Sequence, residues 1–492
     1  MKKAVAVSAL LAMLFSLVPQ SANATAWYPD YGDVRTQEHM VLELLETHIV
    51  PSSVIEGAWW NSKAEKESFA QPKGNKICTS LGTFPCLVSD RTQLHGHFLA
   101  PTCSDSPTNC ILSIYAEVEG QKVQGQFLGY QNQQLAKGFP SLGFKGVGGT
   151  ISLWDIPGAI HAGGTSTYAA AAGYHFVVEN GRFRPTEFKS VIMPYLEESS
   201  QSANDVTFSD GTNQEGKPWV GFSGPPQGCA WSRAGVCGTL YDFNPQIVLG
   251  LELKFENYFT NWFKARIEKP EISIRSATGG SKLITVSGKP VTVPMFAYAL
   301  KAEELSKEIV KLVGTKTFMK IPGRYGLDNN SDLSMEFVDA YRKTVGDQAA
   351  GVKTAWTFSN VDRGGGDPCL SGGNEVLGIV TTNAMVYQPQ PPRFERGFLN
   401  YKVSGMHYLP GGEELALGTY DLVMRSSVAR CLYNISQAPL SAKVSVVNDR
   451  GDRVFATTTV SEKNGWLRLS AKGFTFSNKT IKVKITKART KR

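Results

Sequence analysis

The sequence predicts a mainly β protein, built from antiparallel β-sandwich domains with a few short helices. Several segments alternate apolar and polar residues, a pattern typical of strands that bury one face in an antiparallel sheet. Two Asn-Gly dipeptides, Asn180-Gly181 and Asn464-Gly465, lie between such segments, and Asn-Gly favours the type I′ turn of a two-residue hairpin. The 48 glycines and 25 prolines in 492 residues suit many short strands joined by tight turns.

The first 24 residues have the form of a secretory signal peptide. Lys2 and Lys3 precede an apolar run over residues 4–18, and Ala22-Asn23-Ala24 has the small-x-small form of a cleavage site. The apolar run falls short of the roughly 20 residues that a membrane-spanning helix needs. We therefore expect residues 1–24 to be removed, the mature protein to be secreted or held at the cell surface, and no transmembrane segment to remain.

The length of the remaining chain favours two or three domains over one, and the composition of 42% hydrophobic and 19% charged residues is that of a globular protein. We expect an N-terminal β-rich domain over residues 25–345, with a helical segment near 299–345, and a C-terminal β-sandwich over residues 346–492. Short strands with regularly spaced turns in the second domain favour a sandwich of immunoglobulin type.

Taken in order, the elements begin with a predicted short helix over residues 38–49, where apolar residues form one helical stripe. Alternation then predicts strands over residues 112–118, with Leu112 and Ile114 on the buried face, and over residues 251–256. These two strands are expected to belong to sheets with one buried face and one wet face.

Two further helices are predicted over residues 299–313 and 331–345, the second with Ser331 or Asp332 as its N-cap. We interpret them as an insertion or connection between the two β-rich domains. Strands follow near residues 420–424, 444–446 and 481–485. The proline-rich segment 388–393 is expected to be a loop inside the C-terminal domain.

The eight cysteines all lie beyond the predicted signal peptide, and an oxidising compartment gives them a reason to pair. Sequence alone does not settle the connectivity. The spacing favours local closure of three close pairs and one long bridge: Cys78–Cys86, Cys103–Cys110, Cys229–Cys237 and Cys369–Cys431. No CxxC pair occurs, which argues against a structural zinc site.

The last half of the chain contains four distinctive segments: residues 257–274 (NYFTNWFKARIEKPEISI), 377–394 (LGIVTTNAMVYQPQPPRF), 399–436 (LNYKVSGMHYLPGGEELALGTYDLVMRSSVARCLYNIS) and 454–486 (VFATTTVSEKNGWLRLSAKGFTFSNKTIKVKIT). They resemble stretches of uncharacterised exported proteins of actinobacteria. The resemblance implies export and a shared architecture. Because that group has no assigned activity, it carries no catalytic residue to this sequence.

The most metal-like cluster is His95-Gly96-His97. Residues i and i+2 of a strand face the same way, so both imidazoles can reach one ion. A metal site needs a third ligand, and no carboxylate lies nearby at a motif spacing. His161 or His175 can be this ligand only if the fold brings one of them close to His95 and His97. The alternative is a polar strand face without a metal.

A basic strand is expected near the end of the chain, where Lys479, Lys482, Lys484 and Lys487 alternate with apolar residues. One interpretation is a surface that contacts an anionic polymer of the cell envelope. The other is a solvated edge strand that its lysines protect from aggregation. The net charge of +8 is scattered over the sequence and does not indicate a nucleic-acid groove.

These observations favour a non-catalytic binding or structural protein that is secreted or surface-associated, with a cell-envelope polymer or glycan as its partner. No catalytic motif is found, and no cofactor is expected, since the glycine-rich segment 145–150 lacks a Walker lysine. The alternative is a secreted hydrolase acting on polysaccharide. Such an enzyme needs two catalytic carboxylates, and the sequence does not show which of the candidates they would be: Asp155, Glu179, Glu187, Glu197 or Glu198.

Overall fold

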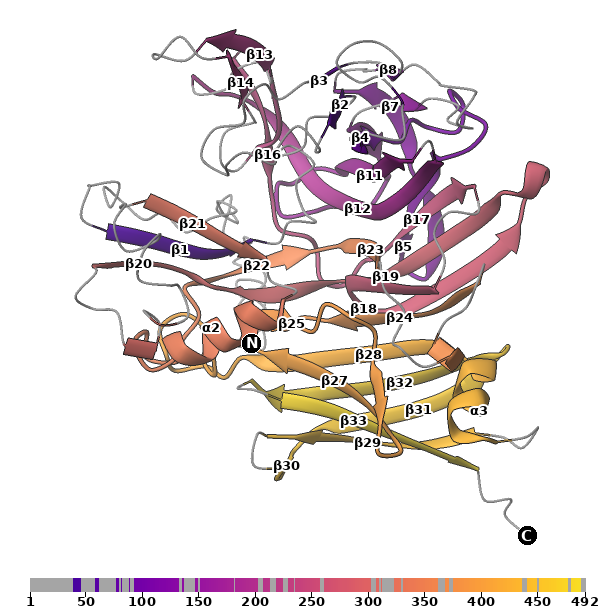
Figure 1. Cartoon of the computed structure of the whole chain (residues 1–492), viewed down its shortest axis with the longest axis vertical. Helices are drawn as coiled ribbons and strands as arrows, with labels where there is room; N and C mark the ends of the chain where they lie inside the picture. The colour runs from indigo at the N-terminus through magenta and orange to yellow at the C-terminus, as the bar shows by residue number, and fades with distance from the viewer. Residues whose placement is uncertain are drawn as a thin grey trace, which may run out of the picture.

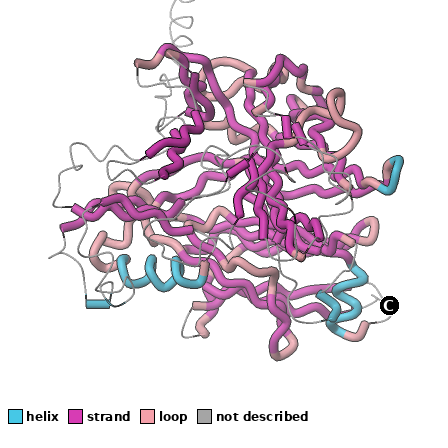
Figure 2. Tube along the Cα trace, turned by 45° about the horizontal axis from the view of Figure 1, so that its top comes forward, coloured by secondary structure: helices cyan, strands magenta, loops and turns pink. Residues whose placement is uncertain are grey.

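The computed structural model describes residues 39–45, 58–61, 77–78, 81, 88, 93–131, 135–136, 147–148, 151–180, 182–201, 207–212, 218–223, 229–233, 235–256, 261–301, 307–308, 311, 323–328, 331–361, 368–370, 375–435, 440–448, 451–476 and 479–487. The signal peptide predicted over residues 1–24 lies outside this part of the chain. Strands predominate in the described residues and most pairs are antiparallel, as the sequence predicts. Figure 2 shows the few helical segments at the margins of the strands.

One long sheet, here called the shared sheet, runs from the top to the bottom of Figure 1. Its strands pair in the order β3 (Ile77–Cys78), β2 (Ala58–Asn61), β4 (Gln93–Leu99), β11 (Thr167–Glu179), β12 (Arg182–Ser199), β23 (Thr357–Val361), β18 (Asn261–Ser276), β24 (Val376–Thr382), β28 (Leu417–Arg425), β32 (Trp466–Thr475) and β31 (Thr457–Lys463). Every neighbouring pair is antiparallel except β18 and β24, which are parallel. Strands from both sides of the predicted boundary at 345/346 therefore belong to one sheet.

A second sheet covers the upper part of the shared sheet. Its strands pair in the order β6 (Gln121–Gln124), β5 (Cys110–Val118), β17 (Val248–Phe255), β19 (Lys282–Met295) and the second half of β18. The apolar core between the two layers includes Phe188, Leu251 and Phe263, all fully buried. The buried face predicted for residues 251–256 is confirmed.

A third sheet, here called the C-terminal sheet, covers the lower part of the shared sheet on its other face. It contains β25 (Val386–Tyr387), β26 (Arg393–Glu395), β27 (Phe398–Ser404), β33 (Lys479–Lys487), β29 (Leu440–Val447) and β30 (Arg453–Val454). A separate core that includes Leu422, Leu469 and Val483 fills the space between the layers. The proline-rich segment 388–393 runs from β25 to β26, which both pair with β27, so it lies inside this unit as predicted.

The strand β24 lies where the two cores meet. All of its residues are buried, Ile379 in the upper core and Leu377 and Val380 in the lower one. Parallel strands are typically buried on both faces, and β24 with its parallel neighbour β18 follows that rule. The molecule therefore consists of two sandwiches that share one layer, and the immunoglobulin type predicted for the lower one remains a prediction.

The remaining strands extend these layers or form small separate sheets. They are β7 (Gln126–Tyr130), β10 (Ser152–Asp155), β15 (Cys229–Arg233), β16 (Val236–Leu240) and β22 (Gly351–Ala355) beside the larger sheets, and the pairs β8 (Leu135–Ala136) with β9 (Val147–Gly148) and β13 (Thr207–Thr212) with β14 (Pro218–Ser223). Short 3-10 turns lie at η4 (Thr278–Gly280) and η6 (Pro368–Leu370).

The helix predicted over residues 38–49 is wrong. Residues 39–45 form β1 (His39–Leu45), which pairs with β20 (Ala297–Lys301) on one edge and with β21 (Gly323–Asp328) on the other. A short apolar run fits a helix and a strand almost equally well, and partners far away in sequence decide between them. The helix predicted over 299–313 is wrong at residues 299–301 for the same reason, although residues 307–308 and 311 are helical.

The second predicted helix is confirmed as α2 (Asp332–Tyr341), with Ser331 as its N-cap accepting a hydrogen bond from the Ser334 amide at 3.0 Å. Phe337, Val338 and Tyr341 are buried against Phe296 and against residues of the lower sandwich.

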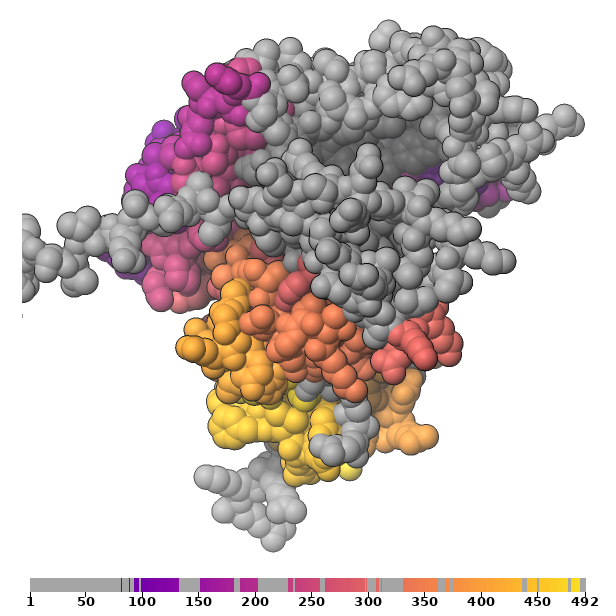
Figure 3. Space-filling view, turned by 90° about the vertical axis from the view of Figure 1, so that its left-hand side faces the viewer, coloured from indigo at the N-terminus to yellow at the C-terminus, as the bar shows by residue number. Residues whose placement is uncertain are grey.

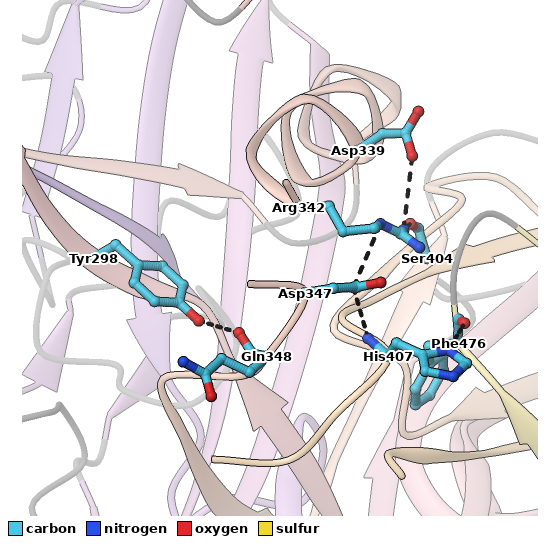
Figure 4. Close-up of polar contacts among 8 residues, drawn as sticks. All are labelled: Tyr298, Asp339, Arg342, Asp347, Gln348, Ser404, His407 and Phe476. Atoms are coloured by element: carbon cyan, nitrogen blue, oxygen red, sulfur yellow. Dashed lines mark hydrogen bonds and ion pairs between the residues drawn. The ribbon is translucent and has the colours of Figure 1, made fainter. Parts of the chain in front are cut away.

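Polar contacts fix the C-terminal end of α2 (Figure 4). Arg342 contacts the carboxylates of Asp339 and Asp347, and Asp347 also accepts a hydrogen bond from the His407 amide at 2.8 Å. The helix is therefore attached to the lower sandwich. The other helix, α3 (Ser426–Tyr433), lies on the opposite side of that sandwich (Figure 1).

One detail of the predicted alternation fails in β5, where Leu112 is 44% exposed and Ile111 is fully buried. The cause is a β-bulge in the pairing with β17, because Glu252 lies opposite Ser113 whereas Leu253 lies opposite Ile111. The extra residue in β5 turns Leu112 outward, as bulges do.

Both predicted Asn-Gly hairpins are confirmed. Glu179 pairs with Arg182 and Lys463 with Trp466, and both turn asparagines have positive φ, as a type I′ turn requires.

Three disulfides join cysteines that the spacing paired: Cys103–Cys110, Cys229–Cys237 and Cys369–Cys431. Cys86 lies outside the described residues, so the bridge to Cys78 remains a prediction. No helix of the described chain is long and apolar enough to cross a bilayer.

The close approach at β24 generates a test of the shared core. A Cβ atom on Gly378 would lie 2.5 Å from the Val423 carbonyl oxygen and 2.6 Å from the Trp262 ring. Gly378→Ala should therefore lower the free energy of unfolding by about 1–3 kcal/mol, measured by denaturant titration, because the backbone oxygen cannot move aside. Gly351→Ala is the control, since its Cβ would meet nothing closer than 3.7 Å. Equal stability of the two variants would contradict the packing described for β24.

Candidate functional site

The basic strand predicted at the end of the chain is β33, and it is an interior strand of the C-terminal sheet. It pairs with β27 on one side and with β29 on the other. The prediction of an edge strand is therefore wrong, because the sequence of one strand does not reveal how many neighbours it has. Protection of a free edge does not explain these lysines.

The outward face of this sheet gathers lysines from three strands. Ile481 and Val483 point into the core and are buried, so Lys482 and Lys484 lie on the opposite face. Lys443 of β29 lies directly opposite Lys484 in the register. On the other side, β27 adds an exposed lysine, Lys402, which lies opposite Thr480. We call Lys402, Lys443, Lys482 and Lys484 the basic face. Figure 3 shows the C-terminal strands at the lower end of the molecule in orange to yellow.

The lysines of the basic face differ from three other lysines of the described chain in their partners. Lys122, Lys189 and Lys472 each form an ion pair with a glutamate. Within the described residues, no ion pair joins a lysine of the basic face to a carboxylate. The Lys484 ammonium lies 5.7 Å from the centre of the Phe398 ring instead. Like charges directly across a ladder destabilise a sheet, and Lys443 and Lys484 form such a pair.

Two lysines of the predicted basic strand do not join this face in the described structure. Lys479 is only 6% exposed. The side chain of Lys487 lies outside the described residues. The sequence analysis did not identify Lys402 and Lys443 as part of this face. Alternation in β27 (FLNYKVS) and β29 (LSAKVSVV) predicts that both lysines point outward, but the sequence does not show that these two strands lie on either side of β33.

A second candidate site is a histidine pair on the shared sheet. His95 of β4 and His175 of β11 lie on adjacent antiparallel strands, and Nδ1 of His95 is 3.3 Å from Nε2 of His175. Both side chains are half-buried. His97 lies opposite His175 in the register, but its own side chain lies outside the described residues. The fold thus brings His175, one of the two suggested partners, to the predicted cluster.

Thr186 orients the His175 ring. Its hydroxyl lies 2.8 Å from Nδ1 of His175 and 3.3 Å from the His175 carbonyl oxygen. The Thr186 hydroxyl thus contacts both a ring nitrogen and the backbone carbonyl of His175, and so fixes the ring orientation. Sequence reasoning missed Thr186, because it is the extra residue of a β-bulge between β11 and β12.

Burial, and secondarily the neighbouring His95 ring, lowers the pKa of His175 to about 4. The ring is therefore neutral at physiological pH. Within the described residues, no group of three histidine, cysteine or carboxylate side chains is assembled as a metal site.

The other suggested ligand, His161, belongs to a separate network. Its Nδ1 accepts a hydrogen bond from the Gly163 amide at 3.0 Å, so its proton is on Nε2, which lies 3.0 Å from the Thr165 hydroxyl. Thr165 in turn contacts Thr167, whose hydroxyl donates to the Tyr195 carbonyl at 2.8 Å. Both nitrogens of His161 are used by this network.

Three of the five carboxylates considered for a hydrolase, Asp155, Glu187 and Glu198, contact local side-chain partners. Asp155 accepts a hydrogen bond from Ser166, and Glu187 forms an ion pair with Lys189 at 2.8 Å. Glu198 accepts hydrogen bonds from Thr239 and Tyr241. These contacts give each of the three carboxylates a structural role.

No protein family, curated protein or solved structure matches this chain.

The His161 network predicts a pH dependence of stability. Burial lowers the pKa of His161 to about 4, below its ordinary value of 6.5, so the unfolded chain binds more protons between these values. The free energy of unfolding should therefore fall as the pH drops from about 6.5 to about 4. His161→Asn keeps an acceptor for the Gly163 amide and cannot titrate. The stability difference between wild type and this variant, measured by denaturant titration, should shrink over that pH range; a difference independent of pH would contradict the assignment.

Proposed function

We propose that this chain is a non-catalytic, secreted or surface-associated protein that binds a phosphate-bearing polymer of the cell envelope through its basic face. The observation that carries the proposal is the placement of Lys482, Lys484 and Lys443 on one exposed sheet surface, two of them directly across a ladder. A polymer with regularly repeated negative charges complements a surface with repeated positive ones.

The energetics of the Lys443–Lys484 pair support a bound anion. Without one, the two ammonium groups repel each other and lower the stability of the sheet. A phosphate lying between them converts this repulsion into two attractive contacts, and Lys402 and Lys482 extend the charged surface across the neighbouring strand. The sheet holds the backbone of these strands rigid, so binding needs no ordering of the backbone.

Export is part of the proposal and is supported by the three disulfides. Disulfide bonds persist in oxidising compartments and are rare in the cytosol. The leader-like residues 1–24 and the resemblance to exported proteins point the same way. An envelope polymer is then the polyanion that the protein meets at the highest local concentration.

The test compares two triple variants with the same charge change. K443Q/K482Q/K484Q should weaken binding to poly(glycerol phosphate) by about tenfold or more at low salt, because it removes most of the basic face. K254Q/K289Q/K463Q removes three lysines of other strands and should bind like wild type. Affinities are measured by titration calorimetry, and wild-type binding should weaken with added salt.

The free energy of unfolding of each variant shows whether weaker binding results from loss of the lysines or from loss of the fold. The basic-face variant removes the repulsion between Lys443 and Lys484, so it should be at least as stable as wild type in denaturant titration. Equal affinity of both triple variants, or equal binding of wild type to a neutral β-glucan, would refute the proposal. Release of soluble sugar from envelope polysaccharide by the wild-type protein would favour the alternative of a secreted hydrolase.

A further inference from the structure

We propose that the basic face selects a phosphodiester polymer whose repeating units carry free hydroxyl groups, and that Asn400 is the residue that selects it. This inference rests on the proposed function, because it concerns which polyanion the same surface binds. Lysines alone attract every polyanion, so discrimination needs a group that interacts differently with a hydroxyl and with a phosphate oxygen.

One row of side chains on the outward face of the C-terminal sheet alternates between cationic and neutral polar groups. Arg393 of β26 lies opposite Asn400 of β27, and Asn400 lies opposite Lys482 of β33. Ser445 of β29 lies opposite Lys482 on its other side. The sequence neighbours of these residues pack on the lower core, so the row itself faces outward. Arg393 is exposed, and Asn400, Lys482 and Ser445 are half-buried.

Backbone contacts hold the amide of Asn400 in one orientation. Its Nδ2 atom donates to the carbonyl oxygen of Phe398 at 3.2 Å and to that of Glu395 at 3.4 Å. Only the N–H end of an amide can bond a carbonyl oxygen, so Oδ1 of Asn400 is directed away from these two contacts. Within the described residues, no group donates a hydrogen bond to Oδ1 of Asn400. This oxygen is therefore available as an acceptor for a ligand.

An acceptor between two cations discriminates between polyanions. Neighbouring strands lie about 4.8 Å apart, so the backbones at Arg393 and Lys482 are about 10 Å apart. A polymer lying across the strands can place one phosphate at each cation and the unit between the phosphates over Asn400. A hydroxyl in that unit donates to Oδ1, whereas an ionised phosphate oxygen has no proton to donate and is repelled by the amide oxygen. The row therefore matches a chain in which phosphates alternate with hydroxylated carbon units.

The experiment compares poly(glycerol phosphate), which has a hydroxyl in each unit, with inorganic polyphosphate, which has none. Both are titrated calorimetrically into the full-length mature protein at equal phosphate concentration. Asn400→Leu removes the acceptor at similar volume, and should weaken binding of poly(glycerol phosphate) by about 3–10-fold without weakening that of polyphosphate. Asn244→Leu is the matched control: Asn244 is also half-buried, lies outside the basic face, and accepts a hydrogen bond from the Gln246 amide at 3.0 Å. It should bind both polymers like wild type.

A second variant keeps the test decisive if Asn400→Leu does not fold. Asn400→Thr suits a strand and replaces the amide oxygen with a hydroxyl that can donate to phosphate, so it should bind polyphosphate at least as tightly as wild type.

The outcomes separate this inference from the proposed function. If K443Q/K482Q/K484Q loses binding but Asn400→Leu binds poly(glycerol phosphate) like wild type, or weakens both polymers equally, selection by Asn400 is wrong and the basic face still stands. If wild type binds neither polymer, or the lysine variant binds both like wild type, both proposals are overturned.

Discussion

The pairing of β18 with β24 is the interaction on which the rest of the structure depends. It is a parallel pair in a mainly antiparallel protein, and it lies where the upper and lower cores meet. All residues of β24 are buried, and its apolar residues contribute to one core or the other, so the strand has no solvent-exposed face. Gly378 allows this pairing, because a side chain there would collide with Trp262 and with the backbone of β28. The pairing of β18 with β24 therefore connects the upper and the lower sandwich.

The sequence was sufficient wherever the information was local. Alternation, Asn-Gly turns and the capped helix α2 each depend on a few neighbouring residues, and all were predicted. Predictions failed where distant partners decide. Residues 39–45 became a strand because β20 and β21 lie on both sides of it, and Leu112 turned outward because of a bulge in its pairing with β17. A doubly buried β24 could not be foreseen without knowing that two cores share one sheet.

The same distinction between local and distant information applies to the candidate sites. His95 and the lysines of β33 could be identified as chemically interesting in the sequence, but their partners could not. His175 is 80 residues away from His95, and Lys443 lies opposite Lys484 only through the register of β29 and β33. Both sites are properties of strand pairing: one sheet brings two imidazoles together, and another spreads like charges over a flat surface.

The bridge between Cys369 and Cys431 has a further consequence. The two cysteines are 62 residues apart in sequence, and the segment between them contains β24, β27 and β28. The strands that hold both cores therefore belong to one covalent ring. A protease that cleaves a single loop inside this ring opens it but releases no fragment, because the two pieces stay joined through sulfur. The centre of the fold is therefore the part of the chain that a first proteolytic cut does not separate into two pieces.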